Sequence, residues 1–354
     1  MRKADYMIVG MGLAGACVAL QLLKLKKRIL VYDQPSQNRA SSVAAGLFNP
    51  VTGRKLVKTW QADKIFPYLH TFYTTAEKTL SRRFFYKKVI YTPFVTVEEQ
   101  NDWVGKDAEA SWSGYILKVA TRPLYENQIH DPLGGIRIGQ GGYVDTNTFL
   151  EGVRSLLKKR RAYREEEWKE DEVYVASDHV MYRGASASKL VFCTGIHALG
   201  SRFFPGLPLV PLKGEVITIS TALPLECIYN RGIYFIPSAP GSYKVGATYD
   251  IKDISARTTA GARAQLVEKA GAFLRNPFHC THQEWGIRPS TMDRRPLLGV
   301  HPAHGHIFIF NGLGTKGVSL APYLSETLVK YMEGDGNLEK EANICRIKPL
   351  SSKF

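Results

Sequence analysis

The chain has 354 residues, 44% of them hydrophobic and 11% aromatic, which is enough for a large core and for two domains. Its 47 Lys and Arg against 32 Asp and Glu give a net charge of +15, which favours anionic partners without specifying a fold. The five cysteines are scattered and lack C-x-x-C spacing, which argues against a disulfide framework or a metal site and predicts a cytoplasmic protein.

The amino-terminal stretch predicts a strand, a tight turn and a helix. Residues 6–9 form a short apolar run typical of a buried parallel strand, and helical apolar phasing follows up to Leu23. Between them, small residues form a turn with G-x-G-x-x-G spacing: Gly10, Gly12, Leu13, Ala14 and Gly15. A second strand, 26–33, ends in Asp33, where a carboxylate can hold a ribose hydroxyl. The stretch therefore predicts a Rossmann-like cradle for the ADP-ribose part of a dinucleotide.

The same stretch is open to a second interpretation, as a secretory signal. Residues 7–23 carry no charge and follow Arg2 and Lys3. Asp5 interrupts the basic start, however, and the glycines are phased for a turn, so we interpret the stretch as part of the fold. No later apolar segment is longer, and we expect no membrane span.

Residues 41–53 follow a turn after the second predicted strand and read Ser-Ser-Val-Ala-Ala-Gly-Leu-Phe-Asn-Pro-Val-Thr-Gly. Small residues and hydroxyls let a backbone pass close to a ligand and donate to its phosphates. After the glycine motif, this stretch resembles the second flavin-contact segment of the D-amino acid oxidase and glycine oxidase superfamily of FAD enzymes. The resemblance implies FAD as the cofactor, with contacts from Gln34, Ser41, Ser42, Ala44, Ala45 and Gly46.

The next hundred residues predict helices and then a sheet. Aromatic and apolar residues at helical spacing indicate helices within 54–80. Arg54, Lys55 and Lys58, followed by residues 82–88, add a basic, aromatic-interleaved surface that is open to two interpretations, a nucleic-acid contact or a half-buried strand with charged flanks. Residues 86–137 alternate strand-like and turn-like pieces without a helix-length apolar stripe, which predicts an antiparallel segment on the substrate side.

The chain then returns to the predicted cofactor domain. Residues 141–161 predict a helix with one apolar face, and the resemblance implies a backbone contact to the adenine near Trp168. Residues 189–195 form a buried strand that ends in Thr194 and Gly195. It resembles the superfamily's Ala-Thr-Gly strand, where the chain passes the cofactor a second time.

Residues 208–217 are similar to the Pro-x-x-Gly-x-Val stretch that leads into the superfamily's substrate domain. Residues 232–248 predict a hairpin, and the resemblance implies that Tyr234 closes the pocket over the flavin. Ser238 stands where those enzymes have Arg or Lys, so a contact from that charge is not expected. Residues 253–274 predict one amphipathic helix.

Residues 284–299 are similar to the superfamily signature Gly-x-Arg-Pro-x-Thr-x-Asp-x-x-Pro-x-x-Gly over nearly its full span. The resemblance implies that Arg288 clamps the substrate carboxylate, a task that suits a planar, always protonated fork. The alternative is a structural arginine paired with a carboxylate such as Asp293.

A last strand, 306–311, and a helix, 318–332, flank a second glycine-rich turn. The resemblance implies that this helix N-terminus faces the pyrimidine end of the flavin and stabilises negative charge there. The expected contacts come from Gly312, Leu313, Gly314, Thr315, Lys316 and Gly317.

These matches predict an α/β, overall α+β, fold in two parts. The Rossmann-like FAD-binding domain with a mixed central sheet is discontinuous, over 1–82, 141–215 and 285–334. An antiparallel substrate domain with helices takes 83–140 and 216–284. Residues 335–354 are polar and predict a C-terminal tail.

The implied activity is oxidation of a C–N bond in a small carboxylate-bearing amine by hydride transfer to flavin N5. Arg288 and Tyr234 orient the substrate, and oxygen or another acceptor takes the electrons. One alternative is oxidation of a glycine-like side chain on a tRNA wobble uridine, which the net charge of +15 favours. The other is a 2-hydroxy-acid oxidoreductase or a non-catalytic flavoprotein.

Overall fold

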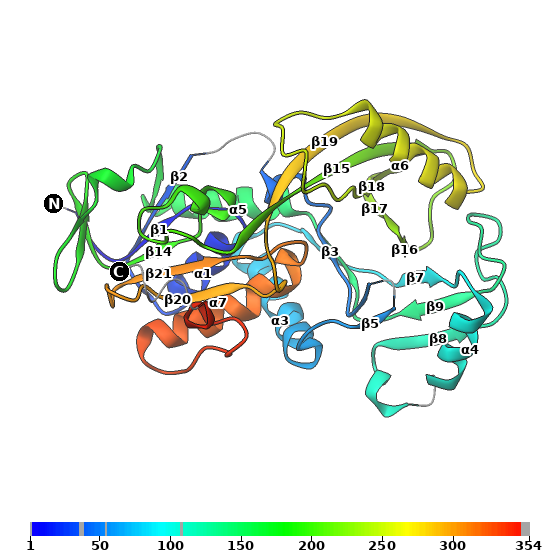
Figure 1. Ribbon diagram of the computed structural model, residues 1–354, viewed down its shortest axis with the longest axis horizontal. Helices are drawn as coiled ribbons and strands as arrows, with labels where there is room; N and C mark the ends of the chain where they lie inside the picture. The colour runs from blue at the N-terminus through cyan, green and yellow to red at the C-terminus, as the bar shows by residue number, and fades with distance from the viewer. Residues whose placement is uncertain (1, 35–38, 54, 107–108, 348–354) are drawn as a thin grey trace.

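The computed structural model describes residues 2–34, 39–53, 55–106 and 109–347. Within these ranges the strands form two eight-stranded sheets and two small ones. The long antiparallel pair β15 (Leu209–Thr221) and β19 (Phe278–Thr291) extends from the part that holds the first sheet to the second sheet (Figure 1). The fold is a mixed α/β fold, as the sequence predicts.

The first large sheet is parallel at its centre, in the order β11-β2-β1-β14, with β21 next to β14. Antiparallel strands β20, β13 and β12 extend it, which makes it mixed. The strands of this sheet are β1 (Arg2–Val9), β2 (Ile29–Asp33), β11 (Tyr163–Glu165), β12 (Tyr174–Val175), β13 (Val180–Tyr182), β14 (Ala185–Phe192), β20 (Leu297–Val300) and β21 (Ile307–Asn311).

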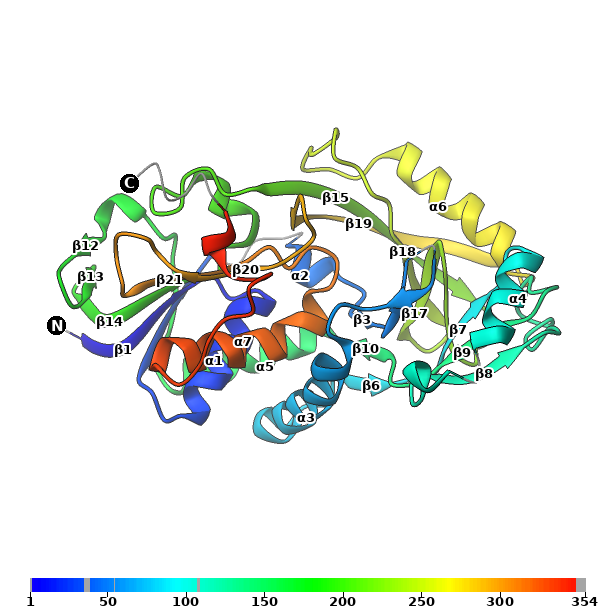
Figure 2. The same ribbon diagram turned by 60° about the horizontal axis from the view of Figure 1, so that its bottom comes forward.

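Helices cover one face of the first sheet, and Figure 2 shows α1, α5 and α7 side by side there. Tyr6 and Ile8 of β1 pack into the core on the helical face, whereas Met7 and Val9 pack into a second core on the opposite face. The period-2 alternation thus places apolar side chains on both faces of a buried strand. The helices are α1 (Leu13–Lys24), α3 (Ala62–Leu80), α5 (Thr146–Lys159) and α7 (Gly317–Glu333).

The second large sheet has the order β19-β15-β18-β17-β16-β7-β9-β8 and is antiparallel except for the β16–β7 pair. Helix α6 (Ala260–Phe273) packs on it through Leu266 and Ala270. The other elements of this region are α4 (Val97–Lys106), β7 (Ile90–Pro93), β8 (Ile116–Ala120), β9 (Gly135–Ile138), β16 (Ile228–Arg231), β17 (Ile233–Ala239) and β18 (Ser242–Gly246).

Short elements connect the two regions. One small sheet pairs β3 (Leu47–Phe48) with β10 (Gly142–Val144) and β6 (Phe85–Lys87), and the other pairs β4 (Val51–Thr52) with β5 (Val57–Lys58). A four-residue helix, α2, covers Ala40–Val43, and 3-10 turns cover Ala110–Trp112, Glu170–Glu172, Gly195–Gly200 and Ile344–Arg346. Within the described ranges, no helix combines the length and apolar character that crossing a bilayer requires.

Three segments differ from the sequence predictions. Helix α6 begins at Ala260 rather than at residue 253, because Thr259 caps it by accepting a hydrogen bond from Ala262 N. Helix α4 lies where only strands and turns are predicted. The helix is polar and buries only Trp103, so its sequence has no apolar stripe that would indicate a helix. In the segment expected to be a tail, Leu338, Ala342 and Ile344 are buried in the two cores.

Candidate functional site

A cavity of about 1910 Å³ is lined by residues of both large sheets. Of the side chains and backbone positions that the sequence predicts to bind cofactor or substrate, all except Gly15 and Ser42 line it. The predicted residues in the lining are Gly10, Gly12, Leu13, Ala14, Asp33, Gln34, Ser41, Ala44, Ala45, Gly46, Trp168, Thr194, Gly195, Tyr234, Arg288, Gly312, Leu313, Gly314, Thr315, Lys316 and Gly317. Residues far apart in the sequence therefore meet at one site.

The first glycine turn forms a cradle that leaves no room for side chains. Gly10 has φ +88°, and a Cβ there would lie 2.6 Å from the Cys193 carbonyl oxygen. A Cβ at Gly12 would lie 3.0 Å from Ser41 Oγ, and one at Gly15 would overlap the Gly10 carbonyl. Gly15 thus lets α1 pack against the turn, as the motif predicts, while Gly12 leaves backbone accessible at the helix N-terminus.

Asp33 ends β2 next to this turn and is only 4% exposed. Its carboxylate accepts hydrogen bonds from Met11 N at 2.9 Å, from Tyr163 Oη at 3.0 Å and from Arg39 Nη1 at 2.9 Å. These bonds fix the carboxylate at the edge of the cradle. Arg39 also lines the cavity and is a residue that the sequence does not single out.

Trp168 lines the same end of the cavity. The centre of its ring lies 3.9 Å from the ring centre of Tyr182 and 5.1 Å from that of Tyr32. Its buried Nε1 has no hydrogen-bond partner among the described residues. A buried donor without an acceptor is costly, so a ligand acceptor would stabilise it. The side-chain-free cradle and this donor both fit a dinucleotide such as FAD.

The second glycine turn, between β21 and α7, is tied to its neighbours by hydrogen bonds. Asn311 Nδ2 donates to Gly195 O at 2.8 Å, and Gly314 N donates to Pro289 O at 3.0 Å. Lys316 precedes α7 and donates to the hydroxyl oxygens of Thr52 at 2.9 Å and Thr59 at 3.3 Å. Burial, helped by Arg295 and Arg294, lowers the pKa of Lys316 to about 8.

Arg288 lies on β19 opposite Leu212 of β15, and its guanidinium occupies the space beside Gly214. Its Nη1 donates to Thr248 O at 3.4 Å, and its Cζ lies 5.2 Å from the centre of the Tyr249 ring. Arg288 forms no ion pair within the described part of the chain. The alternative pairing with Asp293 is wrong, because the Asp293 carboxylate binds Arg346 at 2.9 Å. Arg288 is therefore available to a carboxylate ligand.

Tyr234 lies on β17 and also lines the cavity. Its ring packs where Gly246 of β18 leaves space, since a Cβ there would lie 2.7 Å from the Tyr234 hydroxyl. Burial raises the pKa of Tyr234 well above its usual range. The phenol is therefore neutral.

A buried ionic network holds the segment that carries Tyr249. Lys213 and Glu215 flank Gly214 on β15 and are 1% and 3% exposed. Lys213 Nζ lies 2.9 Å from Asp253 Oδ2 and 3.6 Å from Glu215 Oε1.

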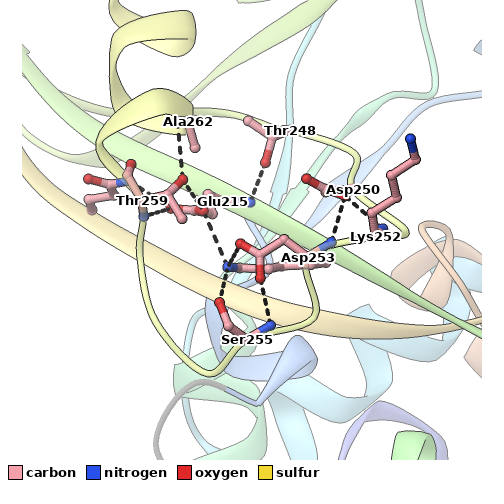
Figure 3. Close-up of polar contacts among 10 residues, drawn as sticks. Glu215, Thr248, Asp250, Lys252, Asp253, Ser255, Thr259 and Ala262 are labelled. Carbon is pink, nitrogen blue, oxygen red and sulfur yellow. Dashed lines mark hydrogen bonds and ion pairs between the residues drawn. The ribbon is translucent and has the colours of Figure 1, made fainter.

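Figure 3 shows the segment 248–259 folded against β15, with Thr248, Asp253 and Thr259 directed toward this network. Glu215 accepts from Thr259 N and Oγ1, both at 2.9 Å. The Lys213 backbone also exchanges hydrogen bonds with Asp250 at 2.8 and 3.0 Å. The network thereby keeps Tyr249 on Arg288.

In the basic, aromatic segment 82–88, residues 85–87 form the strand β6, and the aromatic side chains do not form an exposed stacking surface. Phe84 and Phe85 are buried in the core, and Tyr86 stacks on Tyr143 with ring centres 4.8 Å apart. Of the two interpretations of this segment, the structure supports the half-buried strand.

The sequence does not single out Tyr249, Arg294 or Arg295, and it marks Lys55 only as part of a basic surface; all four line the cavity. Tyr249 directly follows the predicted hairpin, and the two arginines lie within the signature 284–299. Their closeness in sequence to these predicted site segments could have indicated them. The contact of Lys55 with the same cavity depends on the fold of residues 51–58.

Comparison with known proteins agrees with this geometry. The family model named DAO and described as FAD dependent oxidoreductase matches residues 5–331. Glycine oxidase of Geobacillus kaustophilus strain HTA426 is 25% identical over 349 residues, which cover 90% of each chain. A solved structure of glycine oxidase from that species has a TM-score of 0.78 and 20% identity, and covers 96% of each chain.

Two further similarities concern other substrates. Iminodiacetate oxidase (IdaA) of Chelativorans sp. BNC1 shares the fold, with a TM-score of 0.77, 18% identity and coverage of 95% of this chain and 98% of its own. The tRNA 5-methylaminomethyl-2-thiouridine biosynthesis bifunctional protein MnmC of Maricaulis maris strain MCS10 is 32% identical over 148 residues. That match covers 41% of this chain and 24% of MnmC.

Proposed function

Because the chain belongs to the DAO family of FAD-dependent oxidoreductases, we propose that it oxidises the C–N bond of a small amine that carries a carboxylate. The observation that carries this proposal is the guanidinium of Arg288, which lines a cavity shared with the two glycine turns and has no carboxylate partner in the described part of the chain. A planar fork without a protein carboxylate matches a ligand carboxylate with two charge-assisted hydrogen bonds.

FAD is held in this proposal by the two ends of the cavity. The turn at Gly10 and Gly12 would hold the pyrophosphate, Asp33 would hold the ribose, and the second glycine turn would hold the flavin end. When bound, FAD supplies the acceptor for the hydride at its N5. The N-terminus of α7 and the ammonium of Lys316 would supply positive charge that stabilises the reduced flavin.

The chain's own residues then orient the substrate. Arg288 fixes the carboxylate, Tyr249 shields the guanidinium from one side, and the neutral Tyr234 closes the pocket. A substrate bound as the neutral amine needs no protein base at this step. Positioning of the reacting carbon is therefore the main contribution of these side chains.

The test combines a flavin spectrum with one variant. The purified protein should be yellow, and its absorbance band should bleach anaerobically with an amine such as glycine or iminodiacetate, the substrates in the names of two similar proteins. Arg288→Ala should raise KM about ten- to a hundredfold, since a hydrogen bond to a charged group contributes about 1.5–3 kcal/mol. Bleaching by 2-hydroxy acids alone would point to a hydroxy-acid oxidoreductase, and an unchanged KM would remove the role of Arg288.

A second candidate function is oxidation of a glycine-like side chain on tRNA. The net charge of +15 and the partial similarity to MnmC favour it. Residues 84–86 do not supply a free stacking surface, however, because Phe84 and Phe85 are buried and Tyr86 stacks on Tyr143. Binding of tRNA that weakens steeply with salt would support this candidate, because phosphate contacts release counterions. Flat or absent binding would reject it.

A further inference from the structure

The carboxylates that line the cavity all come from one part of it, the end of β2 and the segment after β11: Asp33, Glu166, Glu167, Glu170 and Asp171. Two cations, Arg39 and Arg202, also line this part; Arg39 pairs with Asp33, and the Arg202 backbone N–H donates to Glu170. The elements around the substrate end contribute only cations among the described lining residues: Lys55, Lys58, Arg288, Arg294, Arg295 and Lys316. A cleft lined by one sign of charge concentrates ligands of the opposite sign.

Four of these cations already have a partner or a role. Lys58 pairs with Asp63 at 3.2 Å, and Arg295 lies 3.5 Å from Glu341 with its guanidinium 5.0 Å from the Trp60 ring. Lys316 donates hydrogen bonds to two threonine hydroxyls, and Arg288 is the proposed site of the substrate carboxylate.

The other two cations at this end, Lys55 and Arg294, have no such partner or role among the described residues. Both are exposed, both line the cavity, and neither forms an ion pair within the described parts of the chain. The neighbouring carboxylate of Asp293 is turned to Arg346, so it does not neutralise Arg294.

The cofactor does not account for these two cations. The pyrophosphate of FAD belongs at the first glycine turn, which lies in the part of the cavity that also holds the carboxylates. Tyr249, which covers Arg288, is 64% exposed, and Val57 beside Lys55 is 54% exposed, so this end opens to solvent. Arg288, Lys55 and Arg294 thus line one cavity, which opens to solvent near Tyr249 and Val57.

We propose that Lys55 and Arg294 bind a second anionic group of the substrate, a carboxylate or a phosphate, while Arg288 binds the first. The preferred substrate is then an amine with at least two anionic groups. This inference rests on the proposed function, because it takes Arg288 as the site of the first carboxylate. The arginine fork and the lysine ammonium both bind such anions in water-exposed sites.

The test measures binding of compounds that cannot be oxidised, by their perturbation of the flavin absorbance spectrum. Propionate carries one carboxylate, succinate carries a second one at the far end of the same chain, and 3-phosphonopropionate replaces that second carboxylate by a phosphonate. The dianions should bind at least about tenfold more tightly than propionate, the gain expected for one further hydrogen-bonded charge. The phosphonate arm shows which of the two anions the rim prefers.

The variant is the double substitution Lys55→Gln with Arg294→Gln. It should abolish the preference for dianions and change the Kd of propionate less than about twofold, since the Arg288 site is retained. The matched control is Lys159→Gln with Arg160→Gln, which removes the same charge from exposed positions at the end of α5, outside the cavity lining. Flavin content and Tm verify that each variant is folded.

Each outcome decides the matter. Equal affinity of the wild type for propionate and both dianions overturns the inference, and so does an equal loss in the test and control variants, which reflects net charge alone. Loss of tRNA binding in the test variant, without any preference for dianions, overturns it in favour of an RNA phosphate site. If Arg288→Ala does not weaken propionate binding, the proposed role of Arg288, and with it the proposed function, is rejected. If dianions are preferred but no amine is oxidised, the anion site is retained and only the oxidase activity is rejected.

Discussion

Two glycines stand behind the two side chains that we propose to hold the substrate. Gly214 leaves the space that the Arg288 guanidinium occupies, and Gly246 leaves the space for the Tyr234 ring. Both glycines lie in central strands, where glycine costs about 0.5–1 kcal/mol relative to alanine. Their presence there is explained by the close approach of a functional side chain.

Gly214→Ala should therefore act like a partial removal of Arg288. The new Cβ would overlap the guanidinium, displace it from the cavity and raise KM for a carboxylated amine about tenfold, the equivalent of about 1.4 kcal/mol. Steady-state kinetics measure the effect. Gly271→Ala is the control, because nothing lies within 4 Å of a Cβ at that position in α6. An unchanged KM in Gly214→Ala would show that Arg288 does not need this place.

The buried ammonium of Lys316 should make the free energy of unfolding depend on pH. Its pKa in the fold, about 8, is below the ordinary value of 10.5, so the folded protein binds fewer protons than the unfolded chain between these values. Its contribution to stability is therefore fully present above about pH 10.5 and is lost as the pH falls through 8. At pH 7 the buried charge costs about 3 kcal/mol, from about 1.4 kcal/mol for each pKa unit.

The measurement compares Lys316→Met with the wild type, both freed of FAD, by urea unfolding at pH 7 and pH 10. The Met variant should be the more stable protein at pH 7, and its advantage should shrink at pH 10. Lys340→Met, at an exposed position, serves as the control for loss of a charge. A difference that is the same at both pH values would contradict the perturbed pKa.

At the scale of elements, the site depends on how residues 248–259 are fixed to β15. Hydrogen bonds from Ser255 and Lys213 hold the pKa of Asp253 well below its usual range, which shows that the carboxylate is bound in its charged form. The sequence predicts part of this segment to be helical. Asp253 and Thr259 instead use their side chains to bond to backbone N–H groups, which favours a turn and a helix cap.

Asp253→Asn should loosen this segment without unfolding the sheet. Tyr249 would then no longer be held on Arg288, so KM should rise several-fold while kcat changes little. Hydrogen exchange of the backbone amides of 248–259 should become faster, which reports local opening directly. Asp253→Glu should restore part of the effect, and Glu268→Gln, at an exposed position on α6, is the control. Uniformly faster exchange over the whole sheet would instead indicate general destabilisation.

The sequence predicts the parts of the site that depend on local motifs. The glycine turns and Arg288 are predicted because each depends on a short motif whose backbone geometry or chemistry restricts the residue type. Lys213, Arg39 and Arg294 are not predicted, because their roles depend on which distant segments fold against them. Helix α4 escapes prediction because its single buried aromatic residue gives no apolar stripe.

At the scale of the whole molecule, the cavity is lined by both large sheets, which the antiparallel β15–β19 pair connects. The lining comes from segments between residue 9 and residue 320, so a dinucleotide bound in that cavity would connect parts of the chain that are far apart in sequence. Since FAD binds the folded chain and not the unfolded one, it should add about 4 kcal/mol of stability at a concentration 1,000-fold above its Kd.

Removing FAD should consequently lower Tm by several degrees, and adding it back should raise Tm with the logarithm of its concentration. The measurement is thermal unfolding of the protein freed of FAD, followed at increasing FAD. Gly12→Val should fold, because the position faces the cavity, but should lose this dependence, because the side chain would occupy the pyrophosphate cradle near Ser41. Gly105→Val serves as a control, since nothing lies within 4 Å of a Cβ there. If Gly12→Val kept the full response to FAD, the cofactor would have to bind elsewhere, and the roles assigned to both glycine turns would fall together.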